Sequence, residues 1–153
     1  MLKLFVPGLA KTAGSKSGFI NPKTGKIIIA PACKGQKDWQ SMITWFALKK
    51  FHRMVLLTGA LRMTTVFNLK RPKAHYGTNG EIKDRFKNID IGHQKKPDLS
   101  KLIRAAEDAL TGVIYKDDSQ ICEHHSYKKY SEKIGVQIII EQVKELENGK
   151  KDD

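Results

Sequence analysis

The sequence predicts an α+β fold, with a mixed β-sheet and two main helices. Two stretches, at about 36–57 and 98–110, place apolar residues three and four positions apart, and several shorter stretches alternate or are apolar throughout. With 153 residues, 40% of them hydrophobic, the chain is long enough for one domain with a core and too short for two. We predict a single domain over residues 1–143 and a charged C-terminal tail over 144–153.

The N-terminal third is predicted to contain a strand, a basic loop or hairpin, and a helix. Leu2–Val6 alternates around Lys3 and is typical of a strand, which Pro7 and Gly8 end. Residues 11–26 are rich in Lys, Gly, Ser and Thr, and Ile27–Ile29 is the expected return strand of a hairpin. From residue 36 to about 57, a helical spacing predicts first a core face and second a dimer surface, made of Trp39, Ile43, Phe46, Ala47, Lys50, Phe51 and Met54.

Leu61–Leu69 alternates as a strand, and an irregular basic segment follows it over residues 70–96. A connection of this length inside a compact domain is usually functional or disordered, and its position before Asp98 favours function. Its lysines and arginines suit contacts to phosphates. Its aromatic side chains either stack on an exposed base or pack within the loop: His75, Tyr76 and Phe86.

The second helix is predicted to begin at or after Asp98, because Pro97 pushes the residue before it toward an extended conformation. Asp98 is therefore the expected N-cap, and Gly112 the expected end. If the chain is still extended at Ser100, that side chain points the same way as Asp98. The apolar face of this helix is predicted to be Leu99, Leu102, Ile103, Ala106 and Leu110.

The C-terminal part is predicted to form two more strands. Val113–Tyr115 is a short buried approach to Asp117 and Asp118, and Ser119–Glu123 is strand-like. Ile121–Tyr130 and Gly135–Val143 are expected to form a hairpin that turns near residues 131–135. Ile138–Ile140 is apolar at every position, which is typical of a central strand covered on both faces.

The charge of the chain is strongly positive, with 28 basic and 16 acidic residues and a formal net charge of +12. This balance disfavours an enzyme of small neutral metabolites and makes a polyphosphate the leading partner, ahead of an anionic membrane surface. No apolar run reaches the roughly 18–20 residues of a membrane span, and the N-terminus lacks a signal-like apolar region. We therefore expect a cytoplasmic protein.

The cysteines do not predict a disulfide or a structural zinc site. Cys33 and Cys122 are far apart and neither belongs to a C-x-x-C motif. Cys122, His124 and His125 lie close together on a predicted strand, but alternation divides them between two faces, and no fourth ligand is apparent.

Asp98, Asp117 and Asp118 are carboxylates in a chain that is otherwise basic, which suggests a metal site facing a polyanion. The alternatives are structural. Asp98 alone is more often a helix cap, and an Asp-Asp-Ser run alone is more often a solvated turn.

Three ordered motifs extend this hypothesis: Asp98–Arg104 reads DLSKLIR, Asp108–Leu110 reads DAL, and Asp117–Gln120 reads DDSQ. They resemble the RusA family of Holliday junction resolvases, whose signature is D-L-D-N/K-L-x-K/R, then D-A-L, then D-D-S/E/A-Q. Upstream, Phe67–Tyr76 is similar to the F-x-x-x-R-P-K-x-H-Y segment of phage-type members. The resemblance covers roughly Phe67 to Tyr130.

The resemblance implies a divalent metal, Mg²⁺ with Mn²⁺ as a substitute, bound by aspartates. By position, Asp98 is the first metal aspartate and Asp118 the third, with Asp117 as a further candidate ligand, and Arg104 occupies the place of the basic catalytic residue. Ser100 occupies the place of the second aspartate, so the site lacks one negative charge, which Asp117, Asp90 or Glu107 would have to replace. Predicted DNA contacts are Lys70, Arg71, Lys73, His75, Tyr76, Lys95, Lys96 and Lys101.

The resemblance further implies a homodimer with a RusA-like fold, encoded by a phage or prophage, that cuts four-way DNA junctions in recombination and repair. Three functions remain open. The first is a metal-dependent endonuclease with the catalytic residues Asp98, Asp118 and Arg104. The second is a branched-DNA-binding protein whose cleavage Ser100 impairs, and the third is a basic RNA-binding protein, for which no RNP or G-x-x-G signature is visible.

Overall fold

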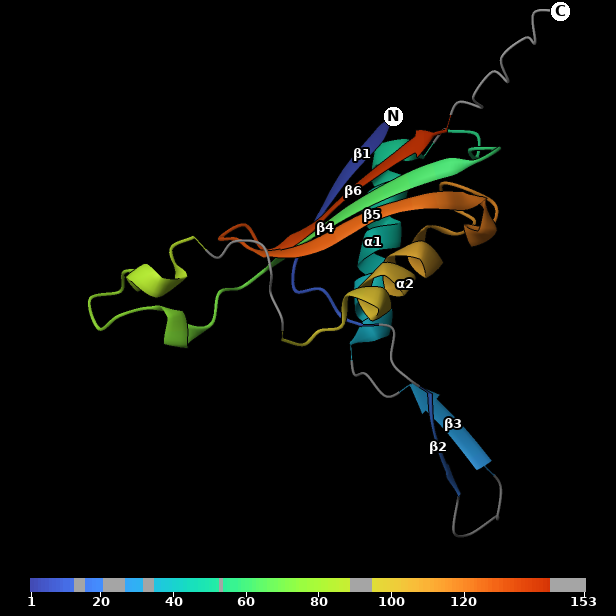
Figure 1. The fold of residues 1–153 in the computed structure, drawn as a ribbon. Coiled ribbons are helices and arrows are strands. Elements are labelled where there is room, and N and C mark those ends of the chain that lie inside the picture. Colours follow the sequence, from blue (N-terminus) through green and yellow to red (C-terminus); the bar gives the residue numbers. More distant parts are fainter. Residues whose placement is uncertain (13–15, 21–26, 32–34, 53, 89–94, 144–153) are drawn as a thin grey trace, which may run out of the picture.

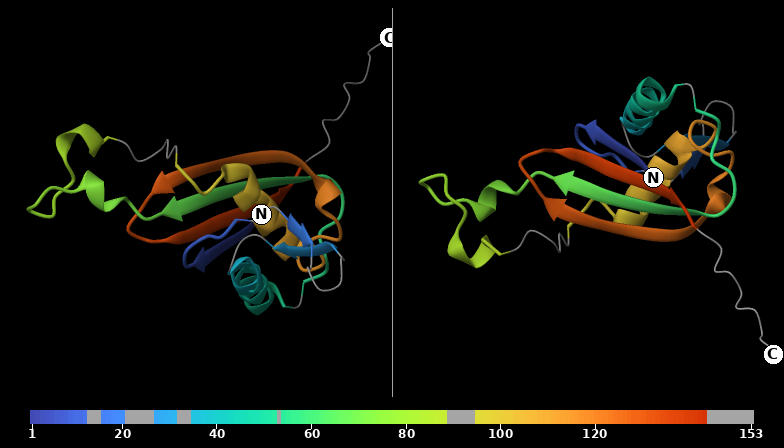
Figure 2. Two further views of the ribbon diagram at one scale, coloured as in Figure 1. Left: turned by 90° about the horizontal axis from the view of Figure 1, so that it is seen from below. Right: turned by 90° about the horizontal axis from the view of Figure 1, so that it is seen from above.

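The computed structural model describes residues 1–12, 16–20, 27–31, 35–52, 54–88 and 95–143. A four-stranded mixed sheet carries the two main helices, α1 and α2, on one face (Figures 1 and 2). This arrangement confirms the predicted α+β class with two main helices. The elements of this body are β1 (Leu2–Pro7), α1 (Gln36–Phe51), β4 (Leu61–Leu69), α2 (Leu99–Leu110), β5 (Ile121–Tyr130) and β6 (Gly135–Gln142).

The strand order of the sheet is β1-β6-β4-β5, so β4 separates β5 from β6. β4 pairs in parallel with β5 and antiparallel with β6, with Met63 opposite both His124 and Ile140. The predicted β5–β6 hairpin is therefore wrong. β4 is paired on both sides, and every residue from Thr65 to Leu69 is buried. The connection after β5 crosses the end of β4, where the Ser131 amide donates to the Leu69 carbonyl (3.0 Å).

The core lies between the sheet and the two helices. Alternate residues of β6, such as Ile138 and Ile140, face the helices and are buried, while Ile139 faces the other way and is half-buried. β6 lies between β1 and β4, so the predicted central position is confirmed. The prediction that the strand is covered on both faces is wrong, because both helices lie on one side. The buried residues of α2 are Leu102, Ala105, Ala106, Ala109 and Leu110.

Helix α1 begins after Gly35, whose φ of 84° favours glycine. Of the predicted core face, Trp39, Ile43 and Ala47 are buried and join the core. Lys50 is exposed, and Met54 lies beyond the end of the helix with 41% of its surface exposed. The helix ends before the predicted boundary near residue 57, so the last part of the helical spacing is not helix.

The basic N-terminal segment forms a hairpin of β2 (Lys16–Ile20) and β3 (Ile27–Pro31). This hairpin is a separate two-stranded sheet that stands away from the body (Figure 1). The hairpin alternative for this segment is confirmed. Cys33, Asp90 and the predicted tail over 144–153 lie outside the described residues.

Residues 70–88, which we call the arm, project beyond the end of β4 (Figure 1). The arm contains two short 3₁₀ turns, η1 (Lys73–His75) and η2 (Asp84–Phe86). A bridge between Tyr76 and Ile82 closes its tip, where the Gly77 amide donates to the Glu81 carbonyl (2.8 Å). The arm is thus an ordered loop without long elements, as the composition of the segment indicated.

Candidate functional site

Helix α2 lies beside the edge strand β5, and the predicted catalytic residues lie on or near this pair of elements (Figure 1). The Lys128 ammonium of β5 donates to the carbonyls of Lys95 (3.0 Å) and Pro97 (2.9 Å), which anchors the chain where it enters the helix. The buried stripe of α2 turns the opposite stripe outward, so Ser100 and Arg104 are exposed.

Asp98 occupies the N-cap position of α2, as predicted, but its side chain makes no capping hydrogen bond. Its carboxylate instead forms an ion pair with Lys101, one turn into the helix, at 3.3 Å. Both side chains are partly exposed, at 51% and 34%, so the pair is weak and both groups remain accessible to a ligand. Lys101, a predicted DNA contact, thus also neutralises Asp98.

Ser100 lies within the first turn of α2. The condition for Asp98 and Ser100 to point the same way, an extended chain, is therefore not met. Ser100, Arg104 and Glu107 are instead spaced four and three residues apart, which places them on one stripe of the helix. This stripe faces outward at its start and becomes half-buried at Glu107.

Beyond α2 the chain folds back against the helix. The Gly112 amide donates to the Tyr115 carbonyl (2.7 Å), and the Tyr115 hydroxyl donates to the Glu107 carbonyl (3.0 Å). These bonds bring the following turn, η3 (Asp118–Gln120), back beside the last part of α2. The predicted strand-like character of Ser119 and Gln120 is wrong, because both belong to this turn.

Asp117 and Asp118 have different surroundings. The Asp117 carboxylate accepts from the Ser119 amide (2.9 Å), while the Gln120 side chain accepts from the Asp117 amide (3.1 Å), so Asp117 caps η3. Hydrogen bonding by Ser119 holds the pKa of Asp117 below its usual value. Asp118 is exposed, and its charge acts on Glu107. A capping role for Asp117 follows, while its role as a metal ligand stays a prediction.

Asp98 is the N-cap of α2, whereas Asp118 belongs to η3, which follows the other end of the helix. The helix between them has 12 residues and is therefore about 18 Å long. Among the described residues, no group of three His, Cys, Asp or Glu side chains is arranged to hold a metal ion. The structure thus separates the two predicted metal aspartates, and a metal that both of them bind stays a prediction.

Glu107 and His124 form a contact that the sequence did not indicate. Nε2 of His124, on β5, lies 3.4 Å from Oε1 of Glu107, with the two side chains 21% and 20% exposed. Nδ1 of His124 is hydrogen-bonded to the Ser126 hydroxyl (2.7 Å), which is itself hydrogen-bonded to the hydroxyl of Thr65 on β4. The sequence offered only a weak signal for this contact, the run of polar residues from Glu123 to Ser126.

The electrostatics of this pair follow from its burial. Burial raises the pKa of Glu107, the charges of Asp118 and Asp108 raise it further, and the Arg104 guanidinium opposes them. Burial, followed by the nearby His125, lowers the pKa of His124. Apart from the effect of Arg104, each of these favours the neutral form of Glu107 or of His124.

The arm holds most of the predicted DNA contacts. Lys70, Lys73, Lys95 and Lys96 are exposed and suit phosphate contacts. Arg71 is only 8% exposed, because its guanidinium donates to the Phe86 carbonyl (3.0 Å) and lies over the Tyr130 ring (4.9 Å).

His75 stacks on Phe86, while Tyr76 is 36% exposed. Tyr76 lines a cavity of about 550 Å³ between the arm and the β5–β6 loop. Arg71 and His75 thus support the arm itself, and Tyr76 keeps an exposed face.

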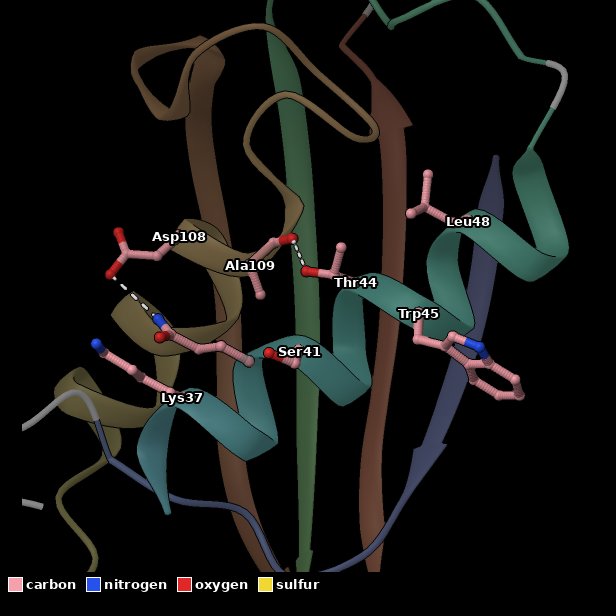
Figure 3. A pocket seen from close by; sticks show the side chains of 8 residues that line it. Lys37, Ser41, Thr44, Trp45, Leu48, Asp108 and Ala109 are labelled. Carbon is pink, nitrogen blue, oxygen red and sulfur yellow. Dashed lines mark hydrogen bonds between the residues drawn. The ribbon is translucent and has the colours of Figure 1, made fainter. Parts of the chain in front are cut away.

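A further groove of about 590 Å³ lies between α1 and α2 (Figure 3). The Thr44 hydroxyl donates to the Ala109 carbonyl (2.8 Å), and the Gln40 amide donates to Asp108 (3.5 Å). The other side chains around the groove are Lys37, Ser41, Trp45 and Leu48. These hydrogen bonds join the two helices, and the sequence had not indicated the groove.

The α+β body carries acidic groups around α2 and a basic arm, and comparison with known families defines the class as endodeoxyribonuclease. The family described as Endodeoxyribonuclease RusA matches residues 16–141. The chain therefore belongs to the RusA family, which confirms the resemblance found in its motifs.

The chain is also similar to a protein of Bacillus subtilis (strain 168), the uncharacterized protein YqaN. The two are 30% identical over 143 residues, which is 93% of this chain and 96% of that protein. No helix among the described residues is long and apolar enough to cross a membrane.

Proposed function

We propose that the protein is a metal-dependent, structure-selective endodeoxyribonuclease that resolves Holliday junctions by paired hydrolysis of phosphodiester bonds. The observation that carries this proposal is the family match over residues 16–141, which includes the α2–β5 face and the arm. The exposed lysines of the arm and the net charge of +12 support a branched DNA substrate. Recombination and repair are the processes that such cleavage serves.

The proposed catalytic residues are Asp98, Asp118 and Arg104. The exposed carboxylates of Asp98 and Asp118 are oxygen donors of the kind that Mg²⁺ prefers, and Mg²⁺ needs only one or two carboxylates besides water and substrate phosphates. When bound, Mg²⁺, or Mn²⁺ in its place, would help to ionise a water and neutralise the scissile phosphate. Arg104 is permanently charged, so its role is to stabilise negative charge on the phosphate rather than to donate a proton.

A homodimer fits the substrate. A four-way junction has approximate two-fold symmetry, so two copies related by a two-fold axis would place one α2–β5 face on each of two opposed strands. Paired incisions would follow from this symmetry. We expect the dimer to act in the cytoplasm of a bacterium, with a phage or prophage as the source of the gene.

The alternative function is that of a branched-DNA-binding protein with impaired cleavage. Ser100 is the observation that favours it, because a neutral hydroxyl stands where the family motif has an aspartate. Ser100 is exposed on the stripe of Arg104, so a carboxylate at this position would also face outward. Loss of one negative charge weakens the binding of hard cations.

The test is cleavage of a labelled four-way junction in Mg²⁺ and in Mn²⁺, beside a gel shift in EDTA, with Asp118→Asn as the inactive control. We expect paired nicks that the control abolishes while it still binds the junction. A junction that is bound and stays intact in both metals would support the alternative. In that case Ser100→Asp should produce a large gain in cutting with binding little changed, whereas a competent enzyme gains little.

A further inference from the structure

A half-buried acid–imidazole pair connects α2 to the edge strand of the sheet. Oε1 of Glu107 and Nε2 of His124 are 3.4 Å apart. The Nε2 atom is buried and makes no hydrogen bond to the described residues, although the carboxylate is this close. A buried nitrogen beside a carboxylate, without a hydrogen bond between them, is unusual, because buried polar atoms are normally satisfied.

A hydrogen bond to Nδ1, the ring nitrogen that does not face Glu107, fixes the orientation of His124. Ser126 lies two residues further along the same strand, and its hydroxyl is hydrogen-bonded to Nδ1 of His124 (2.7 Å). Ser126 also lies opposite Thr65 in the β4–β5 register, and the two hydroxyls are hydrogen-bonded. These hydrogen bonds can run in either of two directions, and in one of them Nδ1 of His124 donates to the Ser126 hydroxyl. The lone pair of Nε2 then points toward Glu107, as in histidines whose second nitrogen is hydrogen-bonded so that the first can bind a metal.

The spacing of the pair suits a bound cation. Histidine nitrogen and carboxylate oxygen ligands lie about 2.0–2.2 Å from a divalent ion, so two ligands on adjacent corners of its shell are roughly 3–3.5 Å apart. The observed 3.4 Å is within this range. Asp118 and Asp108 add negative charge around Glu107, and the Arg104 guanidinium is the opposing charge that acts on it.

We propose that Glu107 and His124 bind a divalent cation at the α2–β5 face, with Asp118 as the neighbouring carboxylate. This inference rests on the proposed nuclease function, and it gives the chain a negative ligand in place of the one absent at Ser100. Water and a DNA phosphate oxygen would have to complete the coordination, since the described residues offer no group of three such ligands. A nitrogen ligand favours Mn²⁺ and later first-row metals over Mg²⁺.

The test uses Mn²⁺ as the probe and the full chain without DNA. Electron paramagnetic resonance measures bound Mn²⁺, and proton NMR measures which histidine ring signals the ion broadens. We expect the His124 signals to broaden before those of His52 and His75. Glu107→Gln should reduce the affinity for Mn²⁺ by about tenfold or more, and Ser126→Ala, which removes only the support of His124, by about tenfold.

The matched control is Glu132→Gln, which removes the same charge from the exposed loop between β5 and β6. It should bind Mn²⁺ as the unchanged protein does, and thermal unfolding of each variant shows that the fold is retained. If Glu107→Gln and Ser126→Ala both keep the original affinity, the pair is a structural bridge and the inference is wrong.

The inference and the proposed function fail differently. Loss of Mn²⁺ binding in Asp118→Asn alone, with cleavage of the junction intact in Glu107→Gln, would overturn the site and leave the nuclease. Broadening of His124 and the expected loss in Glu107→Gln, without cleavage of any junction, would leave the site and overturn the nuclease.

Discussion

His75 stacks face to face on Phe86, with ring centroids 3.9 Å apart and ring planes 7° from parallel. Tyr130 at the end of β5 packs edge-on against the same imidazole (5.3 Å). Two of the three rings that the sequence offered for stacking on a DNA base therefore cover one another and attach the arm to the sheet. Of the three candidate aromatic residues, Tyr76 keeps the exposed face.

Replacing Phe86 by Ala should loosen the arm. The stack contributes about 0.5–1.5 kcal/mol beyond the area it buries, whereas the backbone carbonyl that accepts from Arg71 remains in the variant. We expect faster limited proteolysis within residues 70–88 and weaker junction binding in EDTA. Phe86→Tyr, which keeps the ring, is the control, and equal proteolysis of Phe86→Ala and the control would contradict the assignment.

The arm should also loosen in acid. Burial lowers the pKa of His75, and the charges of Arg71, Lys95, Arg85 and Lys83 add to this effect. The unfolded arm therefore binds a proton more readily, beginning near the usual histidine pKa of about 6.5. Stability of the arm is complete above this pH and is lost as the pH falls toward the lower pKa of the folded state. Proteolysis at pH 5.5 and 7.5 checks this, with His75→Asn expected to show a smaller difference.

Arg104→Ala should lower the rate of junction cleavage by about 100- to 1000-fold, because it removes the positive charge that we propose stabilises the phosphate. Arg104 is exposed and contributes little to packing, so thermal stability should change little. Single-turnover cleavage and a gel shift separate the two effects. Recovery of part of the rate in Arg104→Lys would support a role of charge, and an unchanged rate in Arg104→Ala would exclude it.

Asp117→Ala should destabilise the turn before β5 by about 0.5–2 kcal/mol, because the side chain caps η3. Asp117→Asn keeps an acceptor for the Ser119 amide and should keep most of this stability. Chemical denaturation measures both variants. Cleavage by Asp117→Asn then tests the separate prediction that Asp117 is a metal ligand, since full activity without this charge would argue against it.

Gly135→Ala should destabilise the sheet by about 2 kcal/mol or more. Gly135 has a φ of 155°, and an added Cβ would collide with the Val6 carbonyl of β1 and lie 2.6 Å from the Phe5 ring. Gly112→Ala is the matched control, because its φ is 76° but nothing lies within 4 Å of the added Cβ. Equal losses in the two variants would mean that backbone strain, not the close approach of β1 and β6, sets the cost.

Local features of the fold could be predicted from the sequence because nearby residues decide them. Pro97 limits where α2 begins, and a spacing of three and four residues places Leu102, Ala106 and Leu110 on its buried face. The alternation of Leu61–Leu69 likewise predicts β4. The sequence did not predict that Asp98 makes no capping bond, because Lys101 comes close to its carboxylate only once the helix has formed.

The sequence by itself determined the class of the protein. It predicted an α+β fold, it carries a positive charge that suits a polyanionic partner, and it contains the ordered motifs of the RusA family. Tertiary structure alone decided the order β1-β6-β4-β5, the distance between Asp98 and Asp118, and the contact of Glu107 with His124. The physical reason is that the spacing of apolar residues shows which face of a helix or strand is buried. Which element packs against that face depends on how the whole chain buries its apolar residues. Residues 17 positions apart meet here only because α2 packs beside β5.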